Sequence, residues 1–196
     1  MKKLTTLLTM ALIALMSLSF TSCDEDSDIA YTLDGTWTGN MQVVYGGYES
    51  TRTVIRFIQN DGVYSGTGYW IDYYGGNYWH GNNYVANRIT WTVRNGNIYI
   101  YLEDEDSEVV IYDYSLSDGA FYGYVDAENG KRARFTMYKD GGSYNWRDYD
   151  YWDDSWDYGY NKHDSSLDGL HVTSRAASDS VKCSVEKPVR KFRLRD

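Results

Sequence analysis

Proline and histidine are scarce in this sequence, and the signatures of common catalytic sites are missing from it. Among 196 residues there are one proline and three histidines, at positions 80, 163 and 171. These histidines do not have metal-ligand spacing such as His-Glu-X-X-His. No Gly-X-Ser-X-Gly elbow or phosphate-cradling glycine loop occurs. The many Asp and Glu residues do not identify a glycosidase pair, because its separation is spatial. The sequence therefore predicts no enzyme, no cofactor and no bound metal.

Basic residues are also in the minority. Nineteen Lys and Arg stand against 28 Asp and Glu, giving a net charge of −9. Binding to a nucleic-acid backbone depends on clustered Lys and Arg. Adhesion to an anionic lipid surface depends on basic segments in the same way. The charge balance therefore argues against both kinds of partner.

The amino terminus has the layout of a secretory signal. Lys2 and Lys3 precede the apolar run 4–18, which is followed by Cys23 and a cluster of acids. The run is shorter than the ~20 residues that span a bilayer comfortably. The acids have the wrong sign for a stop-transfer flank, which argues against a transmembrane anchor. We expect residues 1–22 to be a removable signal peptide.

The junction at Cys23 resembles the lipobox of bacterial lipoproteins. Thr21 and Ser22 are the small residues that precede the cysteine, although Phe20 stands where the family usually has Leu. The resemblance implies that Cys23 is acylated and becomes the new amino terminus, with ordinary secretion as the alternative. An acylated Cys23 would leave Cys183 without an intramolecular disulfide partner. The chain would then be stabilised by its core alone.

The acids that follow Cys23 bear on location. Asp directly after the lipidated cysteine resembles an inner-membrane retention signal of Gram-negative bacteria. The full cluster over 24–28 is more similar to the export signal of Bacteroidetes-type surface lipoproteins. That resemblance implies a lipid anchor in the outer membrane with the chain exposed at the cell surface. Residues 23–33 are otherwise expected to be a solvated acidic tether.

Residues 34–140 read as short strands separated by turn signals. Tyr and Trp favour strands and Gly supplies turns, and the chain has 21 Tyr, 7 Trp and 18 Gly. Ile89, Trp91 and Val93 alternate with polar residues, and Asn95-Gly96 is a strong hairpin signal. The pattern predicts an all-β, eight-stranded antiparallel up-and-down barrel that leaves no open edge, with a two-layer sandwich as the alternative. The expected strands are 36–45, 51–59, 63–73, 84–94, 97–102, 107–116, 120–127 and 131–139.

Within this region "LDGTWTG" (33–39) resembles the Gly-X-Trp motif of lipocalins and their calycin relatives, at Gly35 and Trp37. The phrases at 61–68 and 118–123 are similar to those of lipocalin-like domains in Bacteroidetes lipoproteins. The resemblance implies that Trp37 closes one end of the barrel beneath an arginine of the last strand. Such a barrel holds a small ligand or is filled by side chains. The candidate arginines are Arg132 and Arg134, and the candidate interior residues are Trp37, Trp91, Phe121 and Phe135.

The aromatic loop region 69–84 is the candidate ligand site. Its rings could stack on an apolar ligand or a sugar face, and hydroxyl groups could be bound by Asp72, Asn77, His80 and Asn82. The alternative is that these rings pack back on the barrel rim. The candidate ligand-binding residues are Trp70, Tyr73, Tyr74, Tyr78 and Trp79.

The carboxy-terminal part divides into two segments of biased composition. Residues 141–163 are rich in Tyr, Trp and Asp and could dock on a partner or, alternatively, stay disordered or loosely docked on the barrel. Residues 164–196 are basic and expected to be a flexible tail. The acidic stretch 103–108 lacks the pattern of a calcium loop and is expected to be a solvated turn. The candidate partner-docking residues are Trp146, Tyr149, Trp152 and Trp156.

Two functions remain open from the sequence. One is a non-catalytic outer-membrane surface lipoprotein that binds a small apolar ligand or a glycan. The other is a structural or accessory lipoprotein that docks onto an outer-membrane complex for nutrient uptake. Tyr and Trp suit either role, because they combine a large contact area with few rotors and a polar tip.

Overall fold

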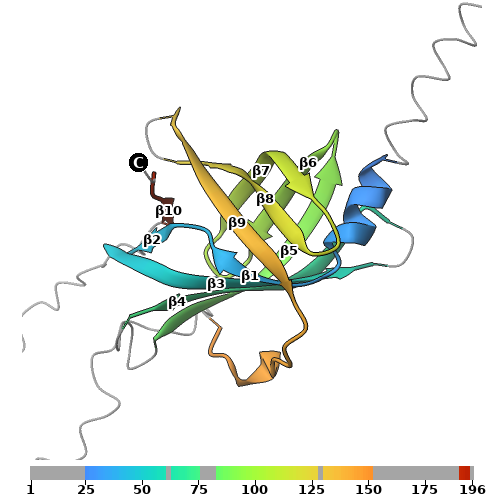
Figure 1. Ribbon diagram of the computed structural model, residues 1–196. Helices are drawn as coiled ribbons and strands as arrows, with labels where there is room; N and C mark the ends of the chain where they lie inside the picture. Colours follow the sequence, from blue (N-terminus) through green and yellow to red (C-terminus); the bar gives the residue numbers. More distant parts are fainter. Residues whose placement is uncertain (1–24, 61–62, 76–82, 128–129, 152–189, 195–196) are drawn as a thin grey trace, which may run out of the picture.

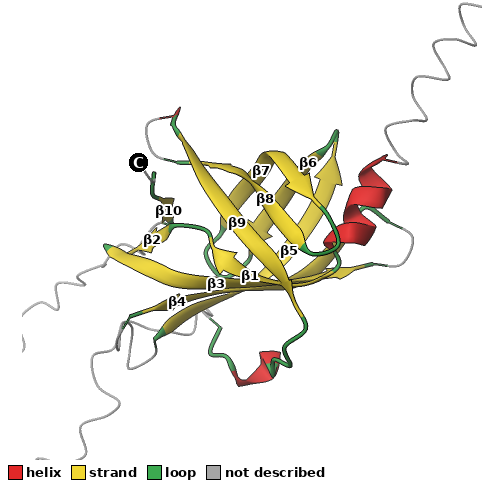
Figure 2. Ribbon diagram, viewed as in Figure 1, coloured by secondary structure: helices red, strands yellow, loops and turns green. Residues whose placement is uncertain are grey.

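The computed structural model describes residues 25–60, 63–75, 83–127, 130–151 and 190–194 (Figure 1). Its strands form an antiparallel ten-stranded sheet in the order β1-β9-β8-β7-β6-β5-β4-β3-β2-β10. An additional pairing of β1 with β3 closes the sheet, so that β1 and β3 to β9 form an eight-stranded barrel (Figure 2). The predicted all-β barrel is confirmed.

The strand bounds are close to those expected from the sequence. Asn95 and Gly96 have φ values of 52° and 73°, as the predicted tight hairpin between β5 and β6 requires. The barrel strands are β1 (Gly35–Asn40), β3 (Tyr48–Gln59), β4 (Ser65–Tyr74), β5 (Tyr84–Arg94), β6 (Asn97–Leu102), β7 (Ser107–Leu116), β8 (Ala120–Asp126) and β9 (Arg132–Asp140).

The first expected strand is broken in two. Gln42 has a φ of 58°, and its backbone N–H donates to Asn40 Oδ1 over 2.7 Å. This local turn ends β1 and directs β2 (Val43–Tyr45) out of the barrel. There β2 pairs with the start of β3 on one side and with β10 (Lys191–Phe192) on the other. The break therefore creates a sheet edge to which the carboxy-terminal segment pairs.

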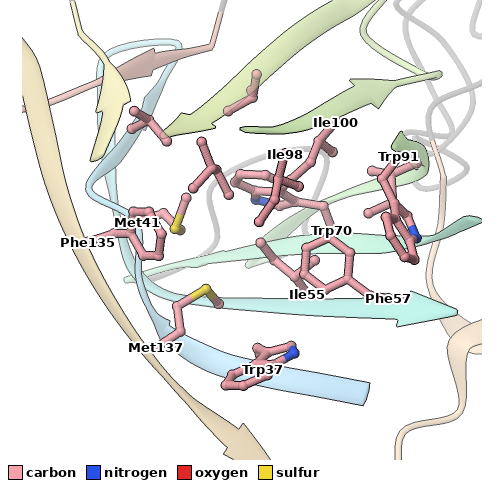
Figure 3. Close-up of a cluster of buried hydrophobic side chains, with 14 of the residues drawn as sticks. Trp37, Met41, Ile55, Phe57, Trp70, Trp91, Ile98, Ile100, Phe135 and Met137 are labelled. Carbon is pink, nitrogen blue, oxygen red and sulfur yellow. The ribbon is translucent and has the colours of Figure 1, made fainter. Parts of the chain in front are cut away.

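The barrel interior is filled by large apolar side chains. Trp37, Trp91, Phe121 and Phe135 are all buried in one core, as expected. Trp91 lies over Gly66, where an added Cβ would come within 2.8 Å of the indole. Figure 3 shows side chains from several strands meeting in the interior, among them Trp37, Met41, Ile55, Phe57, Trp70, Trp91, Ile98, Ile100, Phe135 and Met137.

A short helix closes one end of the barrel. Residues 25–33 are helical, and Ala30 and Leu33 belong to the main core (Figure 1). Asp26 accepts hydrogen bonds from the backbone N–H groups of Asn95 and Gly96, at 3.0 and 2.8 Å. The expected acidic tether is therefore a packed helix from residue 25 onward. The Asp26 side chain of this helix binds the turn between β5 and β6.

Trp37 lies beneath this helix, but its cationic partner differs from the one that the resemblance implied. Its indole Nε1 donates to the Leu33 carbonyl over 2.7 Å. Lys139 Nζ lies 5.2 Å from the ring centroid, whereas Arg132 and Arg134 are exposed. The expectation of Arg132 or Arg134 is wrong, because residues of β9 alternate between faces and both arginines point outward.

Gly35 is required at the start of β1. Its φ of 138° is strained for other residues, and an added Cβ would lie 2.6 Å from Lys139 Cε. Glycine therefore lets Lys139 reach over Trp37. Gly35 and Trp37 both lie at this closed end of the barrel.

In the described part of the chain, no helix is long and apolar enough to cross a membrane. The apolar run 4–18 and Cys23 lie outside the described residues.

Candidate functional site

The end of the barrel opposite the helix, here called the mouth, is occupied by the chain's own carboxy-terminal segment, residues 190–194. In β10, Lys191 pairs with Val44 and Phe192 with Val43, and the Arg193 N–H donates to the Gln42 carbonyl over 2.8 Å. Phe192 is buried in the main core. The segment was expected to belong to a flexible tail, yet these residues pair with β2 and contribute Phe192 to the main core.

Arg190 forms a buried ion cluster with two carboxylates at the mouth. Its Nε and Nη2 donate to the two oxygens of Glu105 at 3.0 and 2.7 Å, and its Nη1 donates to Asp72. The side chains of Arg190, Asp72 and Glu105 are 2%, 0% and 4% exposed. Two carboxylates therefore bind the planar guanidinium group away from water. Charge-assisted hydrogen bonds of this kind are strong and directional.

The carboxylates are held by further donors. Thr53 Oγ1 and Trp70 Nε1 donate to Asp72 at 2.6 and 3.0 Å, and Asn87 Nδ2 donates to Glu105 over 2.7 Å. Burial raises the pKa of Asp72 above its ordinary value, although Arg190, Thr53 and Trp70 act to lower it. Burial lowers the pKa of Arg190, but the charges of Glu105 and Asp72 outweigh this and raise it well above the ordinary value. Arg190 is therefore a fixed cation.

The candidate ligand-binding residues do not form one surface. Trp70 and Tyr74 are buried and point into the barrel, where Arg190 lies 5.1 Å from the Trp70 ring centroid. Tyr73 points to the outer face, and its hydroxyl lies 2.5 Å from that of Tyr149. Period-two alternation along β4 separates these neighbours. Tyr78 and Trp79 lie outside the described residues.

The acidic turn between β6 and β7 is more than a solvated loop. Asp104 is buried, accepts from the Arg88 N–H over 2.6 Å and pairs with the Arg88 guanidinium at 2.5 Å. Glu105 holds Arg190, and Asp106 accepts from the Tyr101 hydroxyl over 2.6 Å. Within the described ranges no group of His, Cys, Asp and Glu could hold a metal ion. Asp104 and Glu105 are structural partners of arginines, and Asp106 is the partner of a tyrosine.

Residues 141–151, here called the outer strap, lie against the outside of β4 and β5 (Figure 1). The Trp146 ring stacks on Tyr69 at 5.3 Å and on Tyr144 at 5.0 Å. A hydrogen bond from the Tyr144 hydroxyl to Asp140, 2.6 Å long, ties the strap to the end of β9. Burial, together with that bond, raises the pKa of Tyr144 to about 12. The hydroxyl is therefore neutral at physiological pH and remains a donor.

The outer strap uses two of the four candidate partner-docking residues within the chain. Trp146 stacks on Tyr69, while Tyr149 contacts Tyr73 and packs edge-on against Tyr84 at 5.1 Å. Both side chains are partly buried. Tyr151 forms a bridge with Ala86, which is buried on the outer face. Trp152 and Trp156 lie outside the described residues.

A second group of tyrosines remains exposed on the opposite half of the outer surface. Along β8 and β9, Tyr122 is 42% and Tyr138 is 58% exposed, and on β6 Tyr101 is 41% exposed. The pairing of β6, β7, β8 and β9 places their outward residues on one continuous sheet face. This tyrosine wall consists of Tyr99, Tyr101, Tyr112, Tyr122, Tyr124 and Tyr138.

Charged groups lie between the rings of the tyrosine wall. Arg132 lies 4.9 Å from the Tyr112 ring centroid and pairs with Asp113 at 2.6 Å. The Tyr112 hydroxyl donates to Asp126 over 2.5 Å. Tyr124 is paired across the strands with Tyr112 on one side and Arg134 on the other. The wall thus combines flat aromatic faces with donors and acceptors at the surface.

No protein-family model matches this chain, and no significant match was found among curated proteins or solved structures.

Proposed function

We propose that the protein is a non-catalytic, lipid-anchored protein of the outer-membrane surface that binds a glycan on its tyrosine wall. The proposal is based on the observation that large apolar side chains fill the barrel. The interior holds Trp37, Trp70 and Trp91, the helix covers one end, and Phe192 packs at the other. A barrel of this size accommodates one small ligand or its own side chains. Binding is therefore assigned to the outer surface.

The tyrosine wall suits a sugar polymer. Neighbouring strands are ~4.8 Å apart and outward residues of one strand ~6.7 Å apart, so rings on the wall recur at short intervals in two directions. Ring faces offer apolar contact to the C–H face of a sugar, and the phenol tips stay in water. Arg134 and Asp126 are exposed beside the rings and can bind hydroxyl groups.

The first prediction of this proposal is that Cys23 carries a lipid anchor. The signal-like segment and the lipobox-like Thr21-Ser22-Cys23 imply a diacylated or triacylated cysteine at the mature amino terminus. Intact-mass analysis of the membrane fraction should show a chain that begins at Cys23 and carries acyl groups. Proteolysis of whole cells should degrade it. An unmodified residue 23 contradicts the anchor, and full protection from protease contradicts surface exposure.

Glycan binding should depend on the exposed rings of the wall. We expect the chain from residue 24 onward to bind at least one polysaccharide in an immobilised glycan panel. Replacing both Tyr122 and Tyr138 with Ala should weaken that binding roughly ten- to hundredfold, since each aromatic contact contributes ~0.5–1.5 kcal/mol. Tyr48→Ala is the control, because Tyr48 is about as exposed as Tyr138 but lies at the start of β3.

The accessory role remains the second candidate, because a filled barrel serves a docking protein equally well. Affinity capture from detergent-solubilised membranes separates the two functions. A stoichiometric membrane protein that is lost from the Tyr122→Ala, Tyr138→Ala variant, with no glycan bound by the unchanged protein, would replace the glycan proposal with docking.

A further inference from the structure

We propose that the mouth is a binding site for an extended Arg-X-Phe strand, and that it accepts residues 190–193 from a second copy of this chain as well as its own. Adjacent chains would thereby link through exchange of their carboxy-terminal segments. This exchange uses the mouth and not the tyrosine wall, so it does not depend on glycan binding.

Three separate features of the mouth recognise the segment. Asp72 and Glu105 bind the guanidinium of Arg190. The edge of β2 pairs with the backbone of Lys191 and Phe192. The main core, with the Trp70 ring 6.5 Å away, receives the Phe192 side chain. A charge pocket, a sheet edge and an apolar pocket at alternate positions are the components of peptide recognition by strand addition.

The carboxy-terminal segment makes its described contacts at the mouth. Its described contacts join residues 190–193 to β2, β3, β4 and the β6–β7 turn. In the sequence, residues 152–189 separate it from the outer strap. Exchange therefore needs no change in the barrel strands, because the same contacts form whichever copy supplies the segment.

The proposed occupant of the mouth is the carboxy-terminal segment of a second copy of this chain. The segment of a second copy carries the same Arg190 and Phe192 at the same spacing. It can therefore make the same contacts in the mouth, as in other exchanges of an element between protomers. A segment tethered to its own chain competes at an effective concentration that reaches the millimolar range for short flexible linkers, so exchange is favoured where copies are crowded. With the lipid anchor of the proposed function, on which this step rests, a membrane surface would provide such crowding.

Disulfide trapping tests the exchange without damaging the site. Val44 and Lys191 are register partners, so cysteines at these positions come within disulfide distance when the segment is seated. One chain carries Val44→Cys and another Lys191→Cys, both beginning at residue 24 and both with Cys183→Ser. After mixing at high protein concentration and mild oxidation, we expect a covalent heterodimer whose linked peptides are identified by mass spectrometry.

Two comparisons make the result specific. A mixture of the Lys191→Cys chain with a Thr67→Cys chain measures crosslinking by random collision, because Thr67 is an exposed position on β4. The heterodimer yield of the Val44→Cys and Lys191→Cys mixture should exceed that of this control at least fivefold. Adding Phe192→Ala to the Lys191→Cys chain should reduce the yield to that collision level. A heterodimer yield equal to the collision control, or one that survives Phe192→Ala, would overturn the proposal.

Discussion

Replacing Arg190 with Met should lower the free energy of unfolding by about 3–5 kcal/mol, which is the usual cost of breaking a buried ion pair from one side. If the segment stays in place, Asp72 and Glu105 lose the cation that compensates them in a buried site. If it detaches, Phe192 becomes exposed and the β2–β10 pairing is lost. Both outcomes weaken the mouth. Chemical denaturation followed by tryptophan fluorescence measures the change.

Arg193→Met is the matched control for this variant. Arg193 also pairs with a carboxylate, that of Glu49, but both side chains are exposed. Exposed pairs contribute about 0–1 kcal/mol, so this variant should be nearly as stable as the unchanged protein. Equal losses in the two variants would contradict the buried ion cluster.

Trp37→Ala should cost about 3–5 kcal/mol, the range measured for truncating a buried large aromatic side chain. Trp37 is fully buried, contacts Phe121 at 5.6 Å between centroids and donates to the Leu33 carbonyl. Its loss would therefore empty part of the core and release the helix that covers this end. Thermal unfolding by circular dichroism gives the comparison with the unchanged protein.

Tyr138→Ala provides the reference for Trp37→Ala. Tyr138 is on β9, where it is the register partner of Thr38 in β1, beside Trp37, but it is exposed. A surface truncation of this kind usually changes stability by less than about 0.5 kcal/mol. A Trp37→Ala loss as small as that of Tyr138→Ala would mean that the barrel end is not packed as described.

Much of the barrel could be predicted from local signals. Asn95-Gly96 specified a tight hairpin, and the alternation of Ile89, Trp91 and Val93 specified the buried face of β5. Both signals act over a few residues, and both are confirmed. The break at Gln42 was missed because a left-handed φ at a non-glycine residue has no sequence signature of its own.

The mouth could not be predicted, because its parts are far apart in the chain. In the sequence, Asp72 lies in the aromatic loop region, Glu105 in an acidic stretch expected to be a solvated turn, and Arg190 in a basic stretch expected to be a flexible tail. Their pairing follows from tertiary contacts. The alternation of Arg190 and Phe192 around exposed Lys191 was the available local signal, but three residues are too few to distinguish a strand.

The same long-range packing changed the interpretation of the aromatic residues. Trp70 and Tyr73 were grouped as one ligand surface, but successive strand residues face opposite sides. Trp146 and Tyr149 were candidates for docking on a partner, with docking on the barrel as the alternative, and they contact Tyr69 and Tyr73 of the same chain. Tyr101, Tyr122 and Tyr138 are exposed together on the sheet face of β6 to β9, whereas the other exposed tyrosines, Tyr31, Tyr48 and Tyr64, lie elsewhere. The tyrosine wall is therefore the surface that we propose for binding.

Titration with a fluorescent fatty acid tests whether the barrel interior is filled by side chains. Trp70 and Trp91 lie in the interior, so a ligand that entered it would accept energy from them. We expect no saturable binding and no energy transfer up to the solubility limit of the probe. Stoichiometric, saturable binding with transfer from tryptophan would show an interior site and contradict the assignment of function to the outer surface.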